Sequence, residues 1–408
     1  MKHLLIVLPL LISLVLTPSS AQALDPATQD RILDTVADTL VDRYVDLEIA
    51  EAMVAAVNAS RERYHALNSP RAFVEAVNRD LFSVSNDLHV QLIYSEPGRE
   101  TLFHAEDNYD FIDARTLPGN IGYLRLDAFS THDEARATAE AALAFLAGTE
   151  ALIVDLRFNG GGSGELVTLM LSYFIDRPTV IAEYHYRWNG NRSAYKTHRR
   201  VAGEKRVGTP LYVLVGPHTA SAAEIFADTV QSFDLGELVG ERTWGLGNVA
   251  DFAVLEAGVS MIFTHGEGRN AKTGTNFAGT GLTPDLACPV DEALEQAHLA
   301  AFDHVGNEDD RGWTEDVIRA RYHPIEPSPE SLTAWVGAYG HDHIRLQDDG
   351  LVWVKEHRPA YPLTPVSDAR FVLTHDPSHL MIELTEESMT LTYANGDRRS
   401  IAKTDPNQ

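Results

Sequence analysis

The sequence predicts an α/β protein in which a sheet covered by helices follows an N-terminal helical region and precedes a C-terminal all-β region. Three observations predict this. Apolar residues recur at helical spacing over residues 25–82, strand runs alternate with helices over about 110–295, and short strands separated by turns fill the chain from about residue 331. The 44% hydrophobic fraction is ordinary for a globular chain and too high for a disordered one.

Residues 1–23 are predicted to be a signal peptide. An apolar run over Leu4–Leu16 is broken by Thr17–Ser20, and Ala21-Gln22-Ala23 is a small-x-small cleavage site. The run is shorter than the roughly 20 residues of a membrane span, and an uncleaved anchor is the alternative. We expect a periplasmic or secreted protein with no stable membrane anchor after signal cleavage.

Residues 24–100 are predicted to form a helical domain, a small bundle of helices. Apolar residues recur there every three or four positions, and a boundary at Asn68-Ser69-Pro70 precedes the last helix. The apolar positions are Ile32, Val36, Leu40 and Val41, then Met53, Val54 and Val57, then Phe73, Val77 and Leu81.

Residues 101–300 are predicted to form the core domain, an α/β unit. Strands are expected over 121–126, 151–156 and 211–215, and helices over 133–147, 165–174 and 222–230. Because the strand runs are apolar and helices intervene, we expect a sheet covered by helices.

Residues 301–330 are charged and proline-containing, which predicts a linker. Residues 331–408 are predicted to form a small all-β C-terminal domain. Asp349-Gly350 and Asn395-Gly396 each separate two short apolar runs, which is typical of hairpins.

Composition excludes several functions. The net charge of −26 disfavours nucleic acid and anionic lipid as partners. The single cysteine, Cys288, excludes an intramolecular disulfide and a cysteine metal cluster. Because no H-E-x-x-H spacing occurs, we expect neither a metal nor an organic cofactor.

The segment Thr219–Glu224 (TASAAE) carries the first candidate for chemistry. It follows a buried strand and a Gly216-Pro217 break, and it opens a helix. Ser221 would therefore lie at the carboxyl end of a strand, where free amides and the helix dipole favour a developing negative charge. Alternatively, Ser221 or Thr219 is simply the helix cap.

A second segment, Asp155–Gly162 (DLRFNGGG), also lies between a buried strand and a helix. Its glycines allow a backbone amide to approach an oxyanion closely. No lysine follows, as a phosphate-binding loop requires, and a plain glycine-rich connector is the alternative. Asp155 and Arg157 could form a structural pair under the site.

A third segment, Asn86–His89, contains a histidine that could act as a general base because imidazole titrates near neutral pH. His89 could equally be structural. His218, three residues before Ser221, and His265 are competitors for the role.

Together these segments resemble the C-terminal-processing and tricorn-core superfamily of serine peptidases, and most closely the branch related to interphotoreceptor retinoid-binding protein. The resemblance covers about residues 28–298. The matching strings, in order, are SNDLHV (85–90), LPGNIGYLRLDAF (117–129), DLRFNGGG (155–162), TASAAEIFA (219–227), GERTWGLG (240–247) and GTNFAGTGLTPD (274–285).

The resemblance implies a ClpP/crotonase-like core in which Ser221 is the nucleophile and His89 is the general base. It implies an oxyanion hole formed by the amides of Ala222 and of Gly160 or Gly161. The substrate it implies is a peptide or an unfolded protein, as for tail-specific proteases.

Two positions depart from the family pattern. The lysine of the serine–lysine dyad is replaced by Leu246, which excludes the dyad mechanism, and a glutamate typical of the histidine branch is replaced by Ala278. The carboxylate orienting His89 is then missing or comes from Asp87, Glu224, Asp228 or Glu267. No PDZ domain fits between His89 and the strand at residue 121.

The leading hypothesis is an exported serine peptidase with a Ser–His mechanism. Ala278 keeps open the alternative of a weakly active or inactive peptidase-fold protein that binds an apolar ligand or a peptide. A non-peptidase esterase is the third hypothesis. The acidic surface would favour basic or neutral substrates, or it could reflect only solubility.

Overall fold

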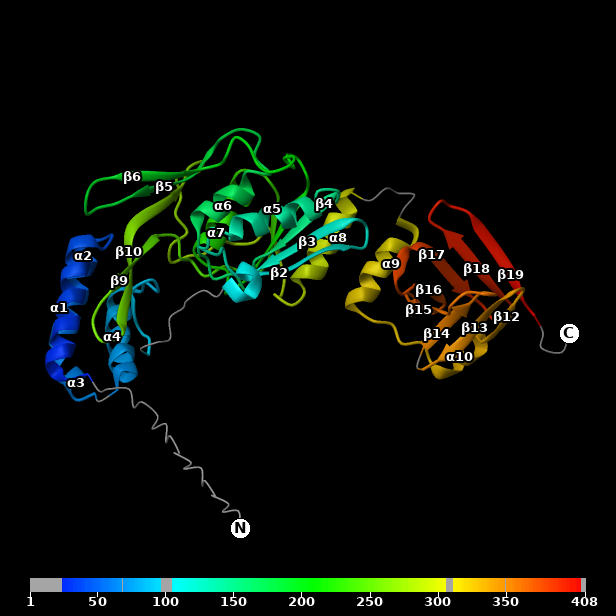
Figure 1. Cartoon of the computed structure of the whole chain (residues 1–408), viewed down its shortest axis with the longest axis horizontal. Helices are drawn as coiled ribbons and strands as arrows, with labels where there is room; N and C mark the ends of the chain where they lie inside the picture. Colours follow the sequence, from blue (N-terminus) through cyan, green and yellow to red (C-terminus); the bar gives the residue numbers. More distant parts are fainter. Residues whose placement is uncertain (1–23, 68, 97–104, 306–310, 349, 405–408) are drawn as a thin grey trace, which may run out of the picture. The chain divides into compact units, whose positions relative to one another are not determined.

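A computed structural model describes residues 24–67, 69–96, 105–305, 311–348 and 350–404 (Figure 1). The predicted signal peptide lies outside the described residues. The chain divides into two compact units, which are described separately. The described residues up to 96, together with 187–189 and 250–265, form the first unit. The described residues of 105–186, 190–249 and 266–404 form the second.

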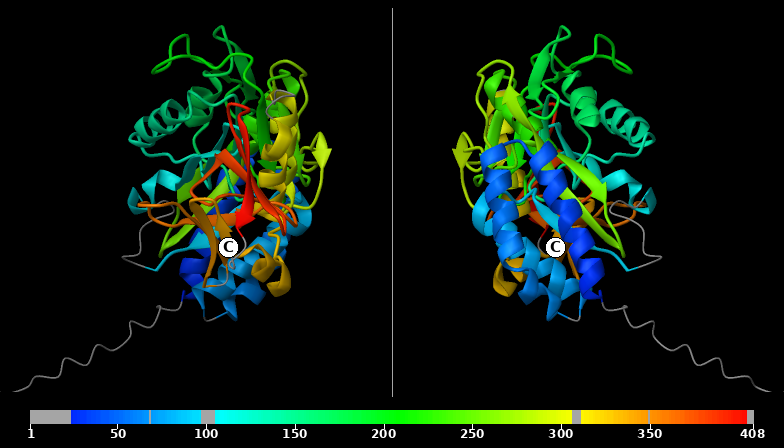
Figure 2. Two further views of the ribbon diagram at one scale, coloured as in Figure 1. Left: turned by 90° about the vertical axis from the view of Figure 1, so that its right-hand side faces the viewer. Right: turned by 90° about the vertical axis from the view of Figure 1, so that its left-hand side faces the viewer.

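The described part of the first unit contains four helices: α1 (Pro26–Arg43), α2 (Leu47–Ala59), α3 (Arg61–His65) and α4 (Pro70–Ser85). The side chains of Asp25, Asp46 and Ser69 accept hydrogen bonds from first-turn amides and cap α1, α2 and α4. Helices α1 and α2 pack side by side (Figure 2).

The helices of the first unit bury their apolar faces against two antiparallel strands, β1 (Gln91–Tyr94) and the first part of β10 (Val259–Asn270). Strand β9 (Val249–Val254) also pairs with β10. Leu92, Met261 and Phe263 join the helix residues in one core. The strands therefore complete a hydrophobic core that the helices could not close alone.

The second unit is built on a six-stranded sheet in the order β11-β8-β7-β4-β3-β2. All neighbours are parallel except β2 and β3, which pair antiparallel. The strands are β2 (Phe111–Leu117), β3 (Ile121–Leu126), β4 (Ala151–Asp155), β7 (Leu211–Val215), β8 (Glu237–Gly240) and β11 (Leu286–Ala287).

Helices cover both faces of this sheet, as its continuous apolar strands require. Helices α5 (Ala135–Phe145), α6 (Gly164–Leu171) and α7 (Ala222–Ser232) share one core with one set of strand residues. Helix α8 (Ala293–Val305) packs through its alanines against the strand residues that point to the opposite face of the sheet. The predicted α/β arrangement is confirmed. A hairpin of β5 (Val180–His185) and β6 (Arg192–Lys196), absent from the prediction, pairs with the last part of β10.

The C-terminal part of the second unit is a closed barrel of eight antiparallel strands, β12–β19, preceded by α10 (Pro329–Trp335). Both predicted hairpins are present, as β13–β14 and β18–β19. The strands are β12 (Gly337–Tyr339), β13 (Asp342–Gln347), β14 (Gly350–Val354), β15 (Tyr361–Pro365), β16 (Arg370–Leu373), β17 (Asp376–Leu384), β18 (Ser388–Tyr393) and β19 (Arg398–Thr404).

The segment predicted as a linker, residues 301–330, contains a helix, α9 (Arg311–Tyr322). Its apolar face is formed by Trp313, Val317 and Ala320, which pack on Val372 and Met381 of the barrel. Glu315, Arg319 and Arg321 of α9 are exposed, whereas Asp316 pairs with Arg370 of the barrel. The high charge of the segment hides this amphipathic spacing in the sequence.

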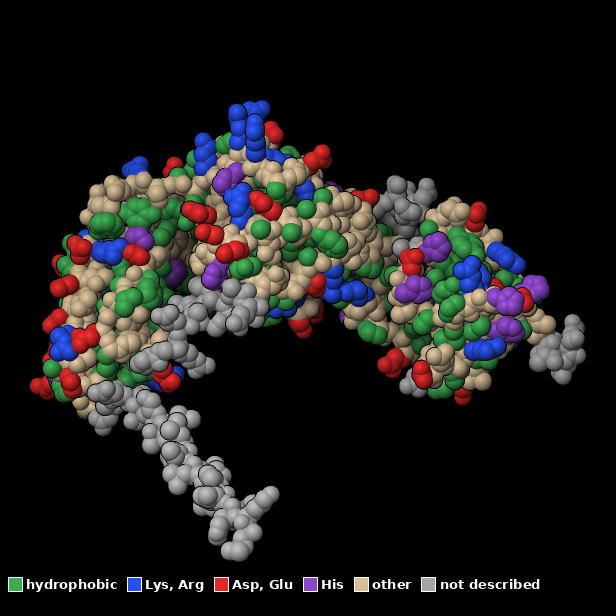
Figure 3. Space-filling view, viewed as in Figure 1, with side chains coloured by type: hydrophobic (Ala, Val, Ile, Leu, Met, Phe, Trp, Pro, Cys, Tyr) green, Lys and Arg blue, Asp and Glu red, His purple; other side chains and the backbone are tan. Residues whose placement is uncertain are grey.

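Acidic and basic side chains are interspersed over the face drawn in Figure 3. None of the helices in the described ranges has the length and apolar character that a membrane crossing requires.

Candidate functional site

Ser221 lies where the loop after β7 turns into α7. It has φ 53° and ψ −116°, a conformation that is strained for a residue with a side chain. The preceding Thr219 fixes this loop, because its hydroxyl accepts from Gly216 N (2.9 Å) and donates to Leu156 O (2.8 Å) at the end of β4. Ser221 is therefore held at the carboxyl edge of the sheet and remains half-buried.

Glu224, one turn into α7, holds the backbone around Ser221. Its Oε2 accepts from the amides of Ser221 (3.0 Å) and Leu246 (2.7 Å), and its Oε1 accepts from Thr243 Oγ1 (2.5 Å) and Gly245 N (2.7 Å). Burial raises the pKa of Glu224, and these four hydrogen bonds oppose the rise. The carboxyl group thus joins the nucleophile segment to the 243–246 segment.

The glycine-rich loop after β4 touches Ser221 directly. Gly161 has φ +107°, and a Cβ built on it would lie 2.8 Å from Ser221 Cβ and 3.1 Å from Ala222 N. Ala220 N donates to Asn159 O (3.0 Å), which ties the two loops together. A glycine is therefore required at position 161 by both the backbone conformation and the close approach.

The three amides predicted for the oxyanion hole differ in their partners. Gly160 N donates to Asp127 O (3.3 Å), and Gly161 N donates to Asn159 Oδ1 (2.9 Å). In the part of the chain that the structure describes, the Ala222 amide donates to no backbone carbonyl outside the helix. Asn159 also donates to Leu126 O (3.0 Å), so it is a second residue that fixes this loop, and sequence reasoning did not single it out.

Asp155 and Arg157 form the structural pair that the sequence suggested. Arg157 Nε and Nη2 donate to the two carboxylate oxygens of Asp155 at 2.9 and 2.7 Å, and Tyr123 Oη donates to Asp155 Oδ2 at 2.7 Å. Arg157 Nη1 also donates to Val290 O (2.7 Å). This buried network supports the loop after β4.

His89 belongs to the first unit and Ser221 to the second, and their pairing stays a prediction. The imidazole of His89 is buried, and this burial lowers its pKa below the ordinary 6.5, while the charge of Asp87 opposes the shift. Asp87 Oδ1 accepts from the backbone amide of His89 (2.9 Å), and its Oδ2 accepts from Tyr44 Oη (3.0 Å) and Thr264 Oγ1 (2.6 Å).

The competing histidines have other surroundings. The ring of His218 is exposed and stacks on Phe158 with 6.3 Å between centroids. His265 lies 6.3 Å from the Phe263 ring, and burial lowers its pKa.

The remaining candidate carboxylates are engaged elsewhere. Asp228 accepts from Asn270 Nδ2 (2.7 Å) and Glu267 accepts from Arg269 (2.6 Å). At the two departing positions, the Leu246 amide binds Glu224, and the Ala278 amide donates to Asn276 Oδ1 (2.8 Å). Within the described ranges, no group of three or more His, Cys, Asp or Glu side chains is arranged to hold a metal ion.

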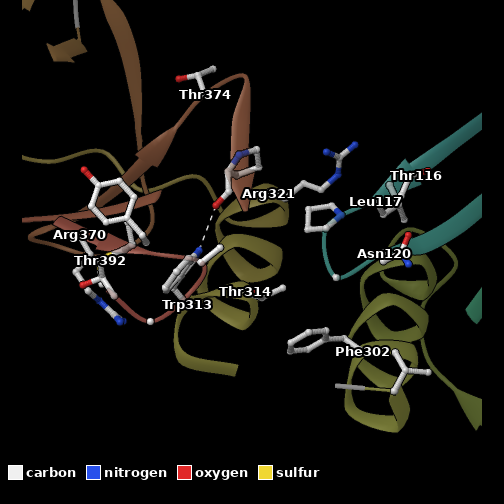
Figure 4. A pocket seen from close by; sticks show the side chains of 18 of the residues that line it. Thr116, Leu117, Asn120, Phe302, Trp313, Thr314, Arg321, Arg370, Thr374 and Thr392 are labelled. Carbon is white, nitrogen blue, oxygen red and sulfur yellow. Dashed lines mark hydrogen bonds between the residues drawn. The ribbon is translucent and has the colours of Figure 1, made fainter. Parts of the chain in front are cut away.

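A large hollow of about 1,200 Å³ in the second unit lies elsewhere (Figure 4). It is lined by the β2–β3 turn with Asn120, by Phe302 at the end of α8, by α9 and by barrel strands. Trp313 Nε1 donates across it to Pro377 O (3.2 Å). No predicted site residue lines this hollow.

Comparisons with known proteins match the central part of the chain. Residues 120–288 match the sequence model of peptidase family S41. The chain is 31% identical over 224 residues to the carboxy-terminal processing protease CtpA of Bacillus subtilis, covering 55% of this chain and 43% of that protein. It is 36% identical over 101 residues to the tail-specific protease of Haemophilus influenzae, covering 24% of this chain and 14% of that protein.

The chain therefore spans less than half the length of both relatives. Among solved structures, a lipoprotein from Streptococcus agalactiae aligns with a TM-score of 0.51 at 17% identity, covering 68% of this chain and 97% of that one. At this identity the likeness concerns the fold alone.

Proposed function

Because residues 120–288 match the sequence model of peptidase family S41, we propose that the protein is a serine peptidase of this family with Ser221 as its nucleophile. The backbone of Ser221 carries the proposal: its conformation is strained and is held in place by contact with Gly161 and by the buried carboxyl of Glu224. Strain of this kind persists where the surroundings impose it, and it is concentrated at active sites. The names of the two relatives favour a peptidase over the ligand-binding alternative.

In the proposed mechanism His89 accepts the proton of the Ser221 hydroxyl, and the alkoxide attacks a peptide carbonyl carbon. As the C–N bond breaks, His89 returns the proton to the leaving amine and an acyl-enzyme remains. A water molecule then loses its proton to His89 and attacks the acyl carbon, which releases a carboxylic acid and restores the Ser221 hydroxyl. The lowered pKa supports this role, because it keeps the His89 imidazole neutral at neutral pH.

The proposed oxyanion hole contains the Ala222 amide and a glycine amide of the loop after β4. The N-terminal position of Ala222 in α7 supports its role, since the helix dipole favours negative charge there. Gly161 is the nearer of the two glycines to Ser221, and its amide would share its proton between Asn159 Oδ1 and the oxyanion. Gly160 remains the second candidate.

Position 246, which matches the family lysine, is a leucine, so the proposed base is His89. We infer that Glu224 is a positioning residue that aligns Ser221 and the 243–246 segment. Asp87 orients His89 through its backbone amide.

We further propose that the substrate is a peptide or an unfolded protein and that the protein acts in the periplasm or outside the cell. The signal-peptide pattern of residues 1–23 supports export. For the fold we infer a ClpP/crotonase-like core with an N-terminal helical bundle. The parallel strands β3, β4 and β7, which are each followed by a helix, support this inference.

The test is hydrolysis of an unfolded protein and of peptide esters by the full chain and by Ser221→Ala. We expect the variant to lose at least about 10³-fold in rate while its circular dichroism and melting temperature are unchanged. Ser163→Ala is the matched control, because Ser163 also precedes a helix of the same unit. Equal turnover by Ser221→Ala and the unchanged protein would refute the proposal.

A further inference from the structure

A small polar hollow lies along α7 in the second unit. Its volume is about 10 Å³, and Ile225, Phe277, Gly247, Tyr184 and Asp228 line it. A space of this size holds about one water-sized group. Apolar side chains form part of the wall. The Asp228 carboxyl, the Tyr184 phenol, the Arg269 guanidinium and the side chains of Asn270, Thr275 and Asn276 supply the polar part.

Two connections place this hollow beside Ser221. Ile225 and Asp228 are four and seven residues after Ser221 on α7, so the three side chains share one helix face and lean toward Ser221. Gly247 directly follows Leu246, whose amide shares the Glu224 Oε2 atom with the Ser221 amide. At a rise of about 1.5 Å per residue, Asp228 lies about 10 Å along the helix from Ser221.

Tyr184 brings an unpaired hydroxyl to the hollow. The residue is 4% exposed, and no described residue forms a hydrogen bond with its Oη. Burial raises the pKa of this phenol, and the neighbouring Tyr195, Tyr186 and Asp228 raise it further. The ring is fixed edge-on against Tyr195 with 5.2 Å between centroids, and Tyr195 in turn packs on Gly164 after the glycine-rich loop. A buried hydroxyl without a protein partner leaves a hydrogen-bonding position that a water molecule or a ligand group can fill.

Asp228 is held in place without a cationic partner of its own. Its Oδ2 accepts from Asn270 Nδ2 (2.7 Å), and the same amide donates to Ser232 Oγ (2.7 Å). The nearby cations are paired with other carboxylates, Arg269 with Glu267 at 2.6 Å and Lys272 with Asp234 at 2.7 Å. A half-buried carboxyl of this kind gains most from a positively charged hydrogen-bond donor.

We propose that this hollow is a specificity subsite that takes the ammonium group of a lysine side chain, on the substrate residue whose carbonyl Ser221 attacks. This inference rests on the proposed function. The aliphatic stem of lysine is long enough to pass Ile225 and pack on Phe277, and its ammonium meets Asp228 and the Tyr184 hydroxyl. An ammonium is water-sized, whereas the planar guanidinium of arginine is larger than the hollow. The net charge of −26 also attracts cationic substrates.

The experiment compares esters of N-acetyl-lysine and N-acetyl-norleucine that carry the same leaving group, hydrolysed by the full chain. Because each has one side chain, only the attacked residue differs. We expect kcat/KM for the lysine ester to be at least about tenfold higher, since a desolvated polar site rejects a side chain that leaves it unpaired. Asp228→Asn should abolish this ratio by lowering the lysine value while changing the norleucine value less than about threefold.

Two further variants keep the test decisive. Asp234→Asn makes the same charge change at an exposed carboxylate on the loop after α7 and should leave the lysine-to-norleucine ratio unchanged. Tyr184→Phe removes a hydroxyl that no described residue uses, so the fold should persist while the ratio falls severalfold. A ratio near one in the unchanged protein, or a ratio that survives both Asp228→Asn and Tyr184→Phe, overturns the subsite.

Failure of the subsite and failure of the peptidase proposal give different results. Ser221-dependent hydrolysis without a lysine preference refutes only the subsite. If neither ester is hydrolysed, or if Ser221→Ala hydrolyses both at the unchanged rate, the peptidase proposal fails. Calorimetric binding of N-acetyl-lysine amide against N-acetyl-norleucine amide then tests the subsite independently, and equal affinities would refute it.

Discussion

Two helices of the second unit, α6 and α7, begin at a serine after a parallel strand and a loop, yet the two junctions differ. Ser163 before α6 has φ −75° and ψ 114°, and its hydroxyl accepts from Leu166 N at 3.3 Å as an ordinary cap. Ser221 before α7 has φ 53° and ψ −116°, and its amide donates to Glu224 Oε2. The same residue type therefore occupies a relaxed conformation at one helix and a strained one at the other.

The first-turn glutamates of these helices differ in the same way. Glu165 of α6 is exposed, whereas Glu224 of α7 is fully buried and accepts four hydrogen bonds. A buried carboxyl and a strained serine both require support from the surrounding chain, which the α6 junction lacks. Capping serines and nucleophilic serines can both stand directly before a helix, so position along the chain does not distinguish them. The supporting contacts around the serine are what make Ser221 a candidate nucleophile.

Apart from the loss of Ser221 itself, the largest effect is expected from Gly161→Ala, which disturbs the contact between the two junctions. The new Cβ would lie 2.8 Å from Ser221 Cβ, and φ +107° is unfavourable for alanine. We expect a loss of about 2 kcal/mol in the free energy of unfolding. We also expect a fall of about 10²-fold in kcat/KM, because small displacements of a nucleophile are costly. Urea denaturation and ester hydrolysis measure the two.

Gly160→Ala is the matched control for this prediction. A Cβ at position 160 meets no atom within 4 Å, and its φ lies outside the left-handed region. We expect stability to change by less than about 1 kcal/mol and hydrolysis to stay within about threefold. If the two variants behave alike, the close approach at Gly161 is not what holds Ser221.

A smaller effect is expected from Glu224→Gln. The NH2 group of the glutamine would face one of the N–H or O–H donors from which the carboxylate now accepts. Two donors cannot hydrogen-bond to each other, so buried groups would be left unpaired. We expect the free energy of unfolding to fall by about 1–3 kcal/mol and hydrolysis to fall about tenfold as Ser221 loosens. Denaturant melts and ester kinetics at one pH test both.

Glu165→Gln removes the corresponding carboxylate of α6. Since this side chain is exposed, we expect a change within about 0.5 kcal/mol and unchanged hydrolysis. Equal losses from both glutamate variants would mean that the two junctions are supported in the same way and would remove the distinction drawn between them.

Much of this architecture could be predicted from sequence periodicity. The strands at residues 121, 151 and 211 and the helices after them stand out because each is a continuous apolar run or an amphipathic segment. Helix α9 was predicted as a linker because its charges mask the face of Trp313, Val317 and Ala320. The β5–β6 hairpin was missed because the residues of β6 are largely exposed and form no apolar run.

The candidate site was predictable only where a resemblance or a glycine run marked it. Ser221 and the loop after β4 stand out in that way. The partners of Glu224, the Asn159 contact with Leu126, and the Tyr184–Asp228 hollow join segments that are far apart in the sequence. Their hydrogen bonds depend on tertiary packing, which single-residue patterns do not encode.

The smallest expected effect concerns His89, the proposed proton acceptor, which belongs to neither helix junction. The effect is a shift in the pH dependence of kcat/KM. Burial lowers the pKa of His89 below 6.5, so its neutral form persists at lower pH, and the acid limb of kcat/KM should lie below pH 6.5. The unfolded chain then binds the proton more readily, so the His89 contribution to stability falls as pH drops through 6.5. Asp87→Asn removes the charge that opposes the shift and should move the acid limb lower by less than about one pH unit.

Asp38→Asn on the exposed face of α1 makes the same change in charge and serves as the control, with no shift of the limb expected. Ester hydrolysis by the full chain between pH 4 and 8 records the limb for all three proteins. A limb at or above pH 6.5, or a move to higher pH in Asp87→Asn, would assign the proton transfer to a histidine other than His89. The exposed His218, three residues before Ser221, would then be the first alternative to examine. If His218 is the base, the α7 junction supplies both the nucleophile and the proton acceptor, which the α6 junction does not.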